Sequence, residues 1–144
     1  YAWGEIETKS SYTPENCTSL NLTEDISGDA RYDAARAKWS STWRMPTIDE
    51  AKELEEYCTI RWVVYNGDEW LMITGPNGNY IFLPAREIYS DLIATSWTST
   101  PSSSPYYQYI AYCIYTHNIN DVWYGYFGVK EERWLERNIR PVSD

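Results

Sequence analysis

The stretch that decides the fold spans residues 46–83 and reads PTIDEAKELEEYCTIRWVVYNGDEWLMITGPNGNYIFL. It opens on a capping box, in which the side chains of Thr47 and Glu50 accept hydrogen bonds from each other's backbone N–H groups. Apolar residues then recur at i, i+3 and i+7 between acidic residues. This pattern predicts a helix over Ile48–Cys58 with a buried apolar face and a solvated acidic face.

The rest of this stretch changes from a helical to an extended pattern. β-Branched and aromatic residues dominate Ile60–Tyr65 and Glu69–Thr74, which flank the hairpin dipeptide Asn66-Gly67. The turn Gly75-Pro-Asn-Gly78 then leads into a third extended run at Tyr80–Leu83. Three antiparallel strands are therefore expected directly after the helix.

The flanking sequence completes the expected order of elements. Small residues share one face of Asp29–Trp39, which predicts a short helix after an irregular leader. Further strands are expected over Tyr106–Thr116, Val122–Phe127 and Asn138–Val142, with a turn at Asn118-Ile-Asn120. Helices early and strands late predict an α+β fold, and a length of 144 residues suits one compact domain, residues 1–144.

The same elements predict which side chains fill the core. Cys58 and Cys113 lie among apolar residues, whereas Cys17 lies in the irregular leader. Two arrangements stay open: one disulfide with a free thiol, or three buried thiols. Widely spaced cysteines and a single histidine argue against a structural zinc site, so no metal is expected. The large apolar side chains expected in the core are Trp39, Trp43, Leu54, Ile81, Leu83 and Trp97.

Net charge and hydropathy exclude two classes of partner. The formal net charge is −9, so the clustered Lys and Arg with which a nucleic-acid binder neutralises phosphates are not expected. No apolar run approaches the roughly 18 residues that a membrane-spanning helix needs. The start of the chain lacks the basic and apolar regions of a signal peptide, as expected of a mature or trimmed product.

Aromatic residues are concentrated near the C-terminus. The chain holds eight Trp, fourteen Tyr and two Phe, and eleven of these rings follow residue 95. That last third is nearly neutral, with five acidic and four basic residues, whereas the preceding part has sixteen and eight. Tyr and Trp are favoured where a ring is apolar on one side and hydrogen-bonded on the other. The rings either pack a β core or form a recognition surface.

Strand alternation selects candidate contact residues from this third. In an extended Tyr106–Thr116, the side carrying Ile110 and Ile114 is the expected core side, together with Tyr106, Gln108 and Tyr112. The other side carries Ala111, Cys113 and Tyr115 together with two exposed tyrosines. Lys130–Arg133 would form a polar rim around them. The candidate ligand-binding residues are Tyr107, Tyr109, Trp123, Tyr124, Tyr126, Trp134 and, from the rim, Arg133.

No catalytic constellation is present in the sequence. It contains no Gly-x-Ser-x-Gly, no His-Glu-x-x-His and no phosphate-binding glycine loop, and its carboxylates show no distinctive pair. The only histidine, His117, falls in the expected turn, where an exposed loop residue is the simpler interpretation than a general base. Asn118–Asp121 is likewise explained by turn formation rather than by calcium binding. We expect neither catalytic residues nor a cofactor.

Several strings resemble the Fibrobacter succinogenes major paralogous domain family of Bacteroidetes surface and secreted proteins. They span almost the whole chain in the order of that family: Tyr1-Ala-Trp-Gly-Glu5; Asp33-Ala-Ala35 leading to Trp43-Arg-Met-Pro-Thr47 with Glu50, Leu54 and Cys58; Thr74-Gly-Pro-Asn-Gly78; Ile81-Phe-Leu-Pro-Ala85; Trp97-Thr-Ser-Thr100; and Arg140-Pro-Val142. The resemblance implies a C-type-lectin-like fold, with two helices flanking a twisted antiparallel sheet.

The chain also resembles the variable proteins of diversity-generating retroelements. That resemblance implies a binding segment at 97–139, rich in the residue types that paratopes use. It implies an extracellular, cell-surface or virion location in a bacterium or phage. Family members commonly carry a further strand upstream of Tyr1, so the resemblance implies a trimmed chain or a strand supplied by a partner or oligomer. Glu136–Ile139 also departs from the family's small, Gly-containing run.

Two functions follow from these expectations. The first is a non-enzymatic recognition or adhesion domain, whose C-terminal aromatic surface binds a protein or glycan ligand on another cell or particle. The second is a structural domain of a cell-surface or phage-virion assembly, whose rings are mostly core. Exposure distinguishes them, because binding requires a solvent-exposed aromatic patch and a scaffold does not.

Overall fold

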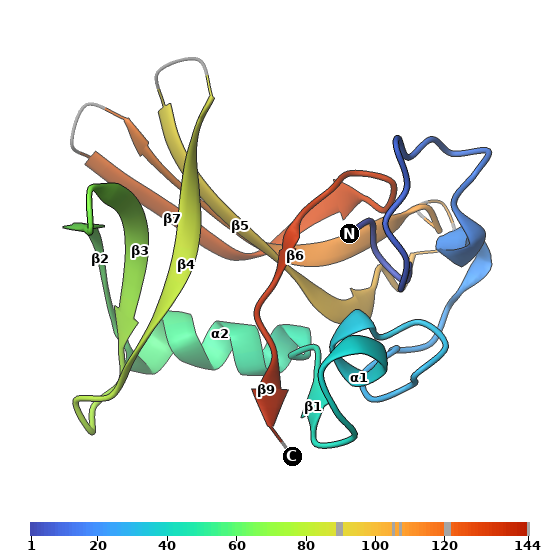
Figure 1. Ribbon diagram of the computed structural model, residues 1–144, viewed down its shortest axis with the longest axis horizontal. Coiled ribbons are helices and arrows are strands. Elements are labelled where there is room, and N and C mark those ends of the chain that lie inside the picture. Colours follow the sequence, from blue (N-terminus) through green and yellow to red (C-terminus); the bar gives the residue numbers. More distant parts are fainter. Residues whose placement is uncertain (89–90, 105, 107, 120–121, 144) are drawn as a thin grey trace.

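The computed structural model describes residues 1–88, 91–104, 106, 108–119 and 122–143. Within these residues the fold is α+β: two α-helices, one 3₁₀ helix, a large and mostly antiparallel sheet, and a small two-stranded sheet (Figure 1). The helical segments are η1 (Thr18–Asn21), α1 (Ala34–Lys38) and α2 (Ile48–Tyr57). The strands are β1 (Trp43–Arg44), β2 (Thr59–Tyr65), β3 (Asp68–Thr74), β4 (Tyr80–Ile88), β5 (Asp91–Pro101), β6 (Ile110–Ile119), β7 (Val122–Glu132), β8 (Asn138–Ile139) and β9 (Val142–Ser143).

The decisive stretch folds as its sequence predicts. The capping box of α2 is complete: Glu50 N–H donates to the Thr47 hydroxyl at 3.3 Å, and Thr47 N–H donates to the Glu50 carboxylate at 2.9 Å. Strands β2 and β3 pair from Thr59↔Thr74 to Tyr65↔Asp68, closed by Asn66 in a left-handed conformation at φ 54°. The predictions of α2 and of the three strands that follow are confirmed.

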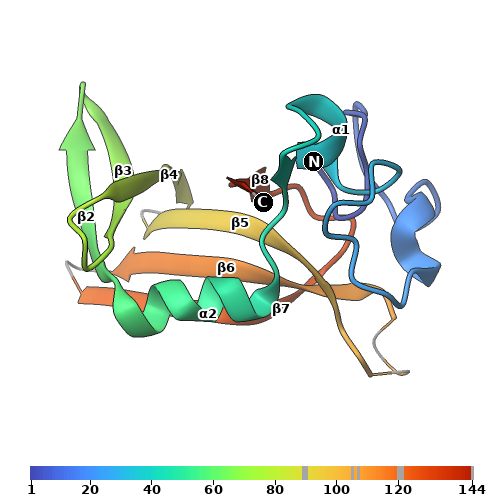
Figure 2. The same cartoon turned by 90° about the horizontal axis from the view of Figure 1, so that it is seen from below.

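The large sheet has the order β2-β3-β4-β5-β6-β7, with β8 added parallel to β5. In Figure 2, α2 lies along one face of β5, β6 and β7, and β2, β3 and β4 rise from one end of that layer. Pro84 stands where β4 changes partner, since the pairing with β3 ends at Trp70↔Pro84 and the pairing with β5 begins at Ala85↔Ala94. A proline has no N–H to donate, so it suits a position between two ladders.

Two apolar clusters fill opposite faces of this sheet. Beneath α2, Ile48 and Ala51 pack against side chains of the sheet that include Leu71, Ile114 and Phe127. On the other face, Trp3, Met45 and Trp97 pack with Ala35, Ala111 and Cys113. The middle of the sheet is therefore covered on both faces, by α2 on one and by the N-terminal segments on the other.

A buried carboxylate organises the segments of the second face. Asp33 is fully buried at the N-cap of α1, and one of its oxygens accepts from the N–H groups of Ala35 and Arg36 at 2.9 and 3.1 Å. Its other oxygen accepts from Gly28 N–H at 2.7 Å and from Met45 N–H at 2.9 Å. This carboxylate therefore joins the leader, α1 and β1 at one point.

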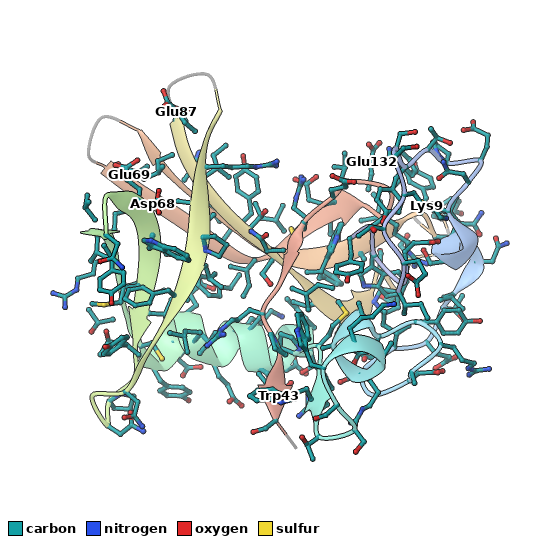
Figure 3. All side chains as sticks on the ribbon, in the orientation of Figure 1. Lys9, Trp43, Asp68, Glu69, Glu87 and Glu132 are labelled. Carbon is teal, nitrogen blue, oxygen red and sulfur yellow. The ribbon has the colours of Figure 1, made fainter. Side chains whose placement is uncertain are left out.

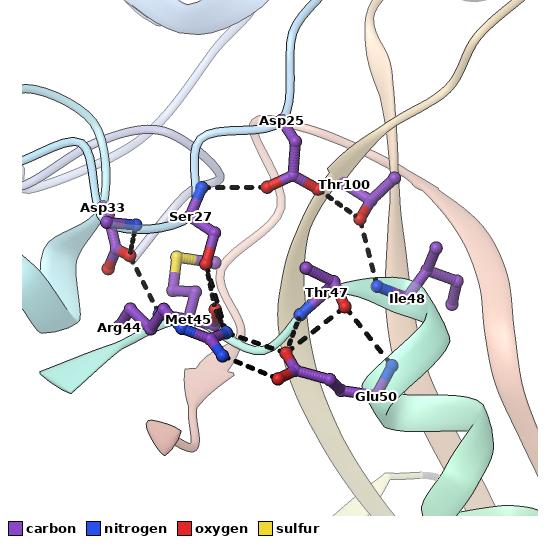
Figure 4. Close-up of polar contacts among 10 residues, drawn as sticks. Asp25, Ser27, Asp33, Arg44, Met45, Thr47, Ile48, Glu50 and Thr100 are labelled. Atoms are coloured by element: carbon purple, nitrogen blue, oxygen red, sulfur yellow. Dashed lines mark hydrogen bonds and ion pairs between the residues drawn. The ribbon is translucent and has the colours of Figure 1, made fainter. Parts of the chain in front are cut away.

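A second polar network joins the leader to the start of α2 and the end of β5 (Figure 4). Arg44 donates to both carboxylate oxygens of Glu50, at 2.8 and 2.7 Å. The Thr100 hydroxyl donates to Asp25 at 2.6 Å and accepts from Ile48 N–H at 3.0 Å. These bonds fix the N-terminus of α2 against β5.

Four expectations about the elements were wrong. Helix α1 begins at Ala34 rather than Asp29, because Asp33 caps it. Strand β5 was not expected, because it contains small polar residues such as Ser96 and Ser99 and its sequence does not alternate between apolar and polar residues. Strand β6 begins at Ile110 rather than Tyr106. It also contains His117, so the expected turn at Asn118 is part of the strand.

The six side chains that were expected in the core are buried in some parts of the fold and exposed in others. Leu83 and Trp97 are buried as expected, and Leu54 and Ile81 are partly buried against the same core. The remaining predictions are wrong. Trp39 is 51% exposed and Trp43 is 40% exposed, because Trp39 lies at the C-terminal end of the short α1 and Trp43 lies in the two-residue edge strand β1.

Candidate binding surfaces

A stacked aromatic pair is exposed where β6 begins and β7 ends. The rings of Tyr109 and Trp134 lie 6.0 Å apart at an interplanar angle of 30°, and Tyr109 is 38% exposed. The backbone holds the pair together, since Arg133 N–H donates to the Tyr109 carbonyl at 2.9 Å. The structure thus brings together two of the seven residues selected from the sequence.

Arg133 does not form part of an exposed rim, and that expectation was wrong. Its side chain is fully buried and lies 4.3 Å from the ring centroid of Trp3. The guanidinium donates to the carbonyls of Ser19, Leu22 and Ile110 at 2.7, 2.8 and 3.2 Å. Burial lowers the pKa of Arg133 to about 10. Arg133 anchors the chain at the point from which Trp134 projects.

The remaining candidates do not join this pair. Tyr126 is 56% exposed, and it pairs with Tyr115 of β6. Tyr115 lies five residues from Ile110, where β6 begins, so at the usual rise of a strand the two positions are about 17 Å apart. Tyr107 lies outside the described residues. Trp123 and Tyr124 belong to β7, but their side chains lie outside the described part of the chain. The described candidates therefore form two separate aromatic surfaces, at Tyr109 and at Tyr126, rather than the single patch that was expected.

The expected core side of β6 is confirmed by Tyr112 and Ile114, but the opposite side is also covered in the middle of the strand. Ala111 and Cys113, on the side opposite the expected core side, are buried against Trp3 and Trp97, and the burial of Cys113 was expected. Ile114 points to the other face, toward α2, as the alternation of a strand requires, and the register shift beside it places one extra residue in β7, between Phe127 and Val129. Because both faces are covered here, alternation separates the two clusters but does not separate buried from exposed side chains.

Tyr126 belongs to the open part of the sheet face opposite α2. The register places it beside Tyr115, whose ring contacts that of His117 edge-on at 5.9 Å. His117 pairs with Ile93, which pairs in turn with Arg86. His117 is half-buried in β6, so the expectation of an exposed loop histidine was wrong.

A third aromatic group covers the outer face of β2, β3 and β4. Phe82 lies at its centre, with ring centroids 5.7 Å from Tyr65, 5.9 Å from Trp70 and 5.3 Å from Tyr80. Three acidic residues, Asp68, Glu69 and Glu87, lie at one end of this part of the sheet (Figure 3). The two features give the three-stranded extension an aromatic face and an acidic end.

A groove separates this aromatic face from the C-terminal end of α1. Its volume is about 500 Å³, and it runs between Trp39 on one side and Trp70 with Phe82 on the other. Segment 137–140 supplies two arginines and an asparagine, and no carboxylate is among the described residues that line it. The lining residues are Tyr1, Trp39, Trp70, Phe82, Leu83, Pro84, Arg137, Asn138, Ile139 and Arg140.

The arginines of the groove differ in their surroundings. Arg137 is held, because its guanidinium lies 3.3 Å from the Glu131 carboxylate and donates to the Glu136 carbonyl at 2.9 Å. Arg140 is exposed, and within the described ranges its guanidinium forms no ion pair. Its backbone N–H donates to the Ser96 hydroxyl at 3.0 Å. Arg140 is therefore the available cation of the groove.

A smaller, apolar cavity of about 220 Å³ lies on the other side of Arg140. Helix α2, strands β3 and β4 and the segment before β9 enclose it with Leu54, Ile73, Leu83 and Val142. Glu50 at its edge is engaged by Arg44. The cavity is a packing gap of the core beneath α2 rather than a polar site.

The described part of the chain offers no cluster of three or more His, Cys, Asp or Glu side chains that could hold a metal ion. The three cysteines are free thiols, so of the two arrangements left open the structure has three thiols. Cys17 and Cys113 are buried, whereas Cys58 is only partly buried. None of the helices that the structure describes is long and apolar enough to cross a membrane.

A search of protein-family models, of curated proteins and of solved structures finds no match to this chain.

Sequence reasoning missed the groove because its walls come from five segments that are distant in the chain: Tyr1, Trp39, Trp70, residues 82–84 and residues 137–140. Trp39 and Trp70 were interpreted as core and strand residues, and Arg140 only as part of the Arg-Pro-Val string. The one local signal was the number of tryptophans, since a tryptophan side chain is rarely buried completely. The number of tryptophans indicates that some of them are exposed, but it does not indicate which ones or where they lie in the fold.

Proposed function

We propose that the protein is a non-enzymatic recognition domain that binds a protein or glycan ligand on another cell or particle. The observation that carries this proposal is the stacked pair Tyr109–Trp134, an exposed aromatic surface on an anchored backbone. Rigid, partly exposed Tyr and Trp rings are the residues that most often dominate binding energy at interfaces. Tyr126 supplies a second contact region on the adjoining face.

The anchoring of the pair supports recognition rather than incidental exposure. Buried Arg133 fixes the backbone through three carbonyl acceptors, one residue before Trp134. A preorganised aromatic pair loses little side-chain entropy when a partner covers it. The pair therefore has the properties of a binding anchor.

The proposal includes the C-type-lectin-like fold and the family resemblance of the sequence. Two of the strings that carry the resemblance pair directly, since Arg44 of β1 lies opposite Val142 of β9. Two others share one cluster, in which Trp3 donates its indole N–H to the Thr98 carbonyl at 2.9 Å. We propose an extracellular, cell-surface or virion location and a bacterial or phage origin on the same basis.

The alternative is a structural domain of a cell-surface or phage-virion assembly. Burial of Trp97 and Phe127 favours it, because these C-terminal rings belong to the core. The exposure of Tyr109 and Tyr126 favours recognition.

The test measures binding of the fluorescently labelled domain to a printed glycan array and to intact bacteria, with and without protease treatment of the cells. Tyr109→Ser and Trp134→Ser should keep the wild-type melting temperature and weaken binding about 30-fold at the better anchor, from a loss of about 2 kcal/mol. Tyr57→Ser, an exposed tyrosine at the end of α2, is the matched control and should bind normally. Sensitivity to protease identifies a protein ligand.

Unchanged binding by both variants would place the site elsewhere. Absence of any wild-type binding to glycans and cells would favour the structural domain. Unfolding of both variants would show that the pair is core, which also favours the structural domain.

A further inference from the structure

The groove between Trp39 and Trp70 combines exposed aromatic faces with unneutralised positive charge. We propose that it binds a carbohydrate that carries a carboxylate group, such as a uronic or sialic acid. This site shares no residue with the Tyr109–Trp134 surface, so it is a second recognition site, independent of the first.

The aromatic walls supply the first part of the argument. A sugar ring has apolar C–H groups on one face and hydroxyl groups around its edge, so it stacks on indole and phenyl rings and remains hydrogen-bonded at its rim. Trp39 presents half of its surface to solvent on one wall, and Trp70 and Phe82 lie on the other. At about 500 Å³, the groove falls within the range of pockets that hold small ligands.

Trp70 contributes an unused donor beside these walls. Its indole N–H is buried and has no hydrogen-bond partner among the residues that the structure describes. Buried donors are nearly always paired, and this one gains a partner when a rotation of the indole brings it to a ligand or water oxygen in the groove. Sugar hydroxyl and ring oxygens are such acceptors.

Charge supplies the second part of the argument. The chain has a net charge of −9, yet no carboxylate is found among the described lining residues, and Arg137 and Arg140 both border the groove. A guanidinium pairs with a carboxylate through two parallel hydrogen bonds, which gives geometric selectivity as well as energy. Because Arg137 is engaged with Glu131, Arg140 is the group that receives the ligand carboxylate.

The acidic end of the sheet limits how the ligand lies. The neighbouring hollow beyond Trp70 and Pro84 is bordered by three carboxylates, Asp68, Glu69 and Glu87, and by one cation, Arg86, so its net negative charge repels a carboxylate placed there. The charged group of the sugar therefore lies toward Arg140, and neutral parts of the chain lie toward Trp70. Asn138 also lines the groove, and its amide can donate to and accept from sugar hydroxyl groups.

The experiment is isothermal titration of the whole chain with two acidic probes and their neutral counterparts. The probes are tri-galacturonic acid, compared with its methyl ester, and 3′-sialyllactose, compared with lactose. At least one acid should bind, and its neutral counterpart at least about tenfold more weakly, because a charge-assisted hydrogen bond is lost. Tetraglutamate is titrated as an acidic ligand without a sugar ring.

Two variants and two matched controls locate the site. Arg140→Gln should reduce affinity for the acid at least about tenfold and remove the preference over its neutral counterpart. Trp39→Ala should weaken the acidic and neutral forms alike, since it removes stacking and not charge. Lys52→Gln and Tyr57→Ala change an exposed cation and an exposed ring on α2, at the opposite face of the sheet, and should leave binding unchanged.

Several results would overturn the proposal. The proposal is wrong if neither acid binds, if an acid and its neutral counterpart bind equally, or if Arg140→Gln binds the acid as tightly as the wild type. It is also wrong if tetraglutamate binds as tightly as the sugars, because that result would indicate a site for acidic peptides. Tyr109→Ser should leave this binding unchanged. Failure here is therefore distinct from failure of the proposed recognition surface.

Discussion

The guanidinium of Arg133 lies 4.3 Å from the ring centroid of Trp3, and both side chains are fully buried. The backbone of the same two residues is also paired, since Trp3 N–H donates to the Arg133 carbonyl at 2.8 Å. Near this contact, η1 supplies Ser19 as a carbonyl acceptor for the guanidinium. A single residue thus joins the end of β7 to the N-terminal segment.

Replacing Arg133 by Met should destabilise the fold by about 3 kcal/mol, because three buried carbonyl groups lose their donor. Arg133→Lys should lose less, since an ammonium group reaches some of the acceptors. Urea denaturation measures both. Arg61→Met, at an exposed arginine of β2, is the control and should change stability by less than about 0.5 kcal/mol. A change below about 1 kcal/mol in Arg133→Met would show that the anchor is dispensable.

Asp33→Asn should be almost as damaging as Asp33→Ala, at about 3 kcal/mol. Each carboxylate oxygen accepts from two backbone N–H groups, so the NH₂ group of Asn would face two donors. Thermal unfolding of the two variants beside the wild type measures the loss. Asp49→Asn, at an exposed residue of α2, serves as the isosteric control. Near-wild-type stability of Asp33→Asn would contradict the four-donor arrangement.

The Arg44–Glu50 pair should give a pH-dependent stability. Hydrogen bonds from Arg44 lower the pKa of Glu50 from its ordinary value of 4.5 to about 2. The charged form is favoured in the folded state, so its contribution is present above pH 4.5 and is lost as pH falls toward 2. Because about a third of the side chain is exposed, screening reduces that contribution to about 1 kcal/mol.

Glu50→Gln keeps an acceptor for Thr47 N–H and removes only the charge. Chemical denaturation at a series of pH values should show the variant less stable at pH 7 and equal to wild type near pH 2. Glu53→Gln, on the solvent face of α2, controls for the change in net charge. A difference that is independent of pH would reject the ion-pair origin.

Cys113 should resist alkylation until the protein unfolds. Burial raises the pKa of its thiol to about 12, so almost none is thiolate at pH 8, and the side chain is inaccessible. Mass spectrometry after iodoacetamide treatment should find native Cys58 modified first and Cys113 modified only in denaturant. Since the unfolded thiol ionises near pH 9, wild type should also lose stability between pH 9 and 12 relative to Cys113→Ala. Rapid native labelling of Cys113 would contradict its position beneath Trp97.

Leu71→Ala should cost about 2–5 kcal/mol, because the side chain is fully buried between the sheet and α2. Val64→Ala, at a 70% exposed position of the neighbouring strand, should cost less than about 0.5 kcal/mol. Equilibrium unfolding in urea compares the two. Similar losses at both sites would show that the end of β2 around Val64 is covered in solution.

Helix α2 and the hairpin of β2 and β3 were predictable from the sequence because their causes are local. Thr47 and Glu50 satisfy each other within one turn of helix, and Asn66 adopts the left-handed conformation that the tight turn needs. The same is true of Leu83 and Trp97 as core residues, whose size and apolar character favour burial in almost any arrangement of these strands. Tyr109 was also selected correctly as an exposed ring.

What the tertiary structure alone decided depends on partners that are distant in the chain. Arg133 looked like a surface cation, and it is buried because Ser19, 114 residues away, supplies a carbonyl acceptor. Strand β5 has no strand pattern because both of its faces are covered, so small polar residues are buried between its neighbours. The groove exists only where Tyr1, α1, β3, β4 and the segment after β7 meet. No local pattern encodes such a meeting, since the free energy that fixes it comes from packing between segments rather than from the conformation of any one of them.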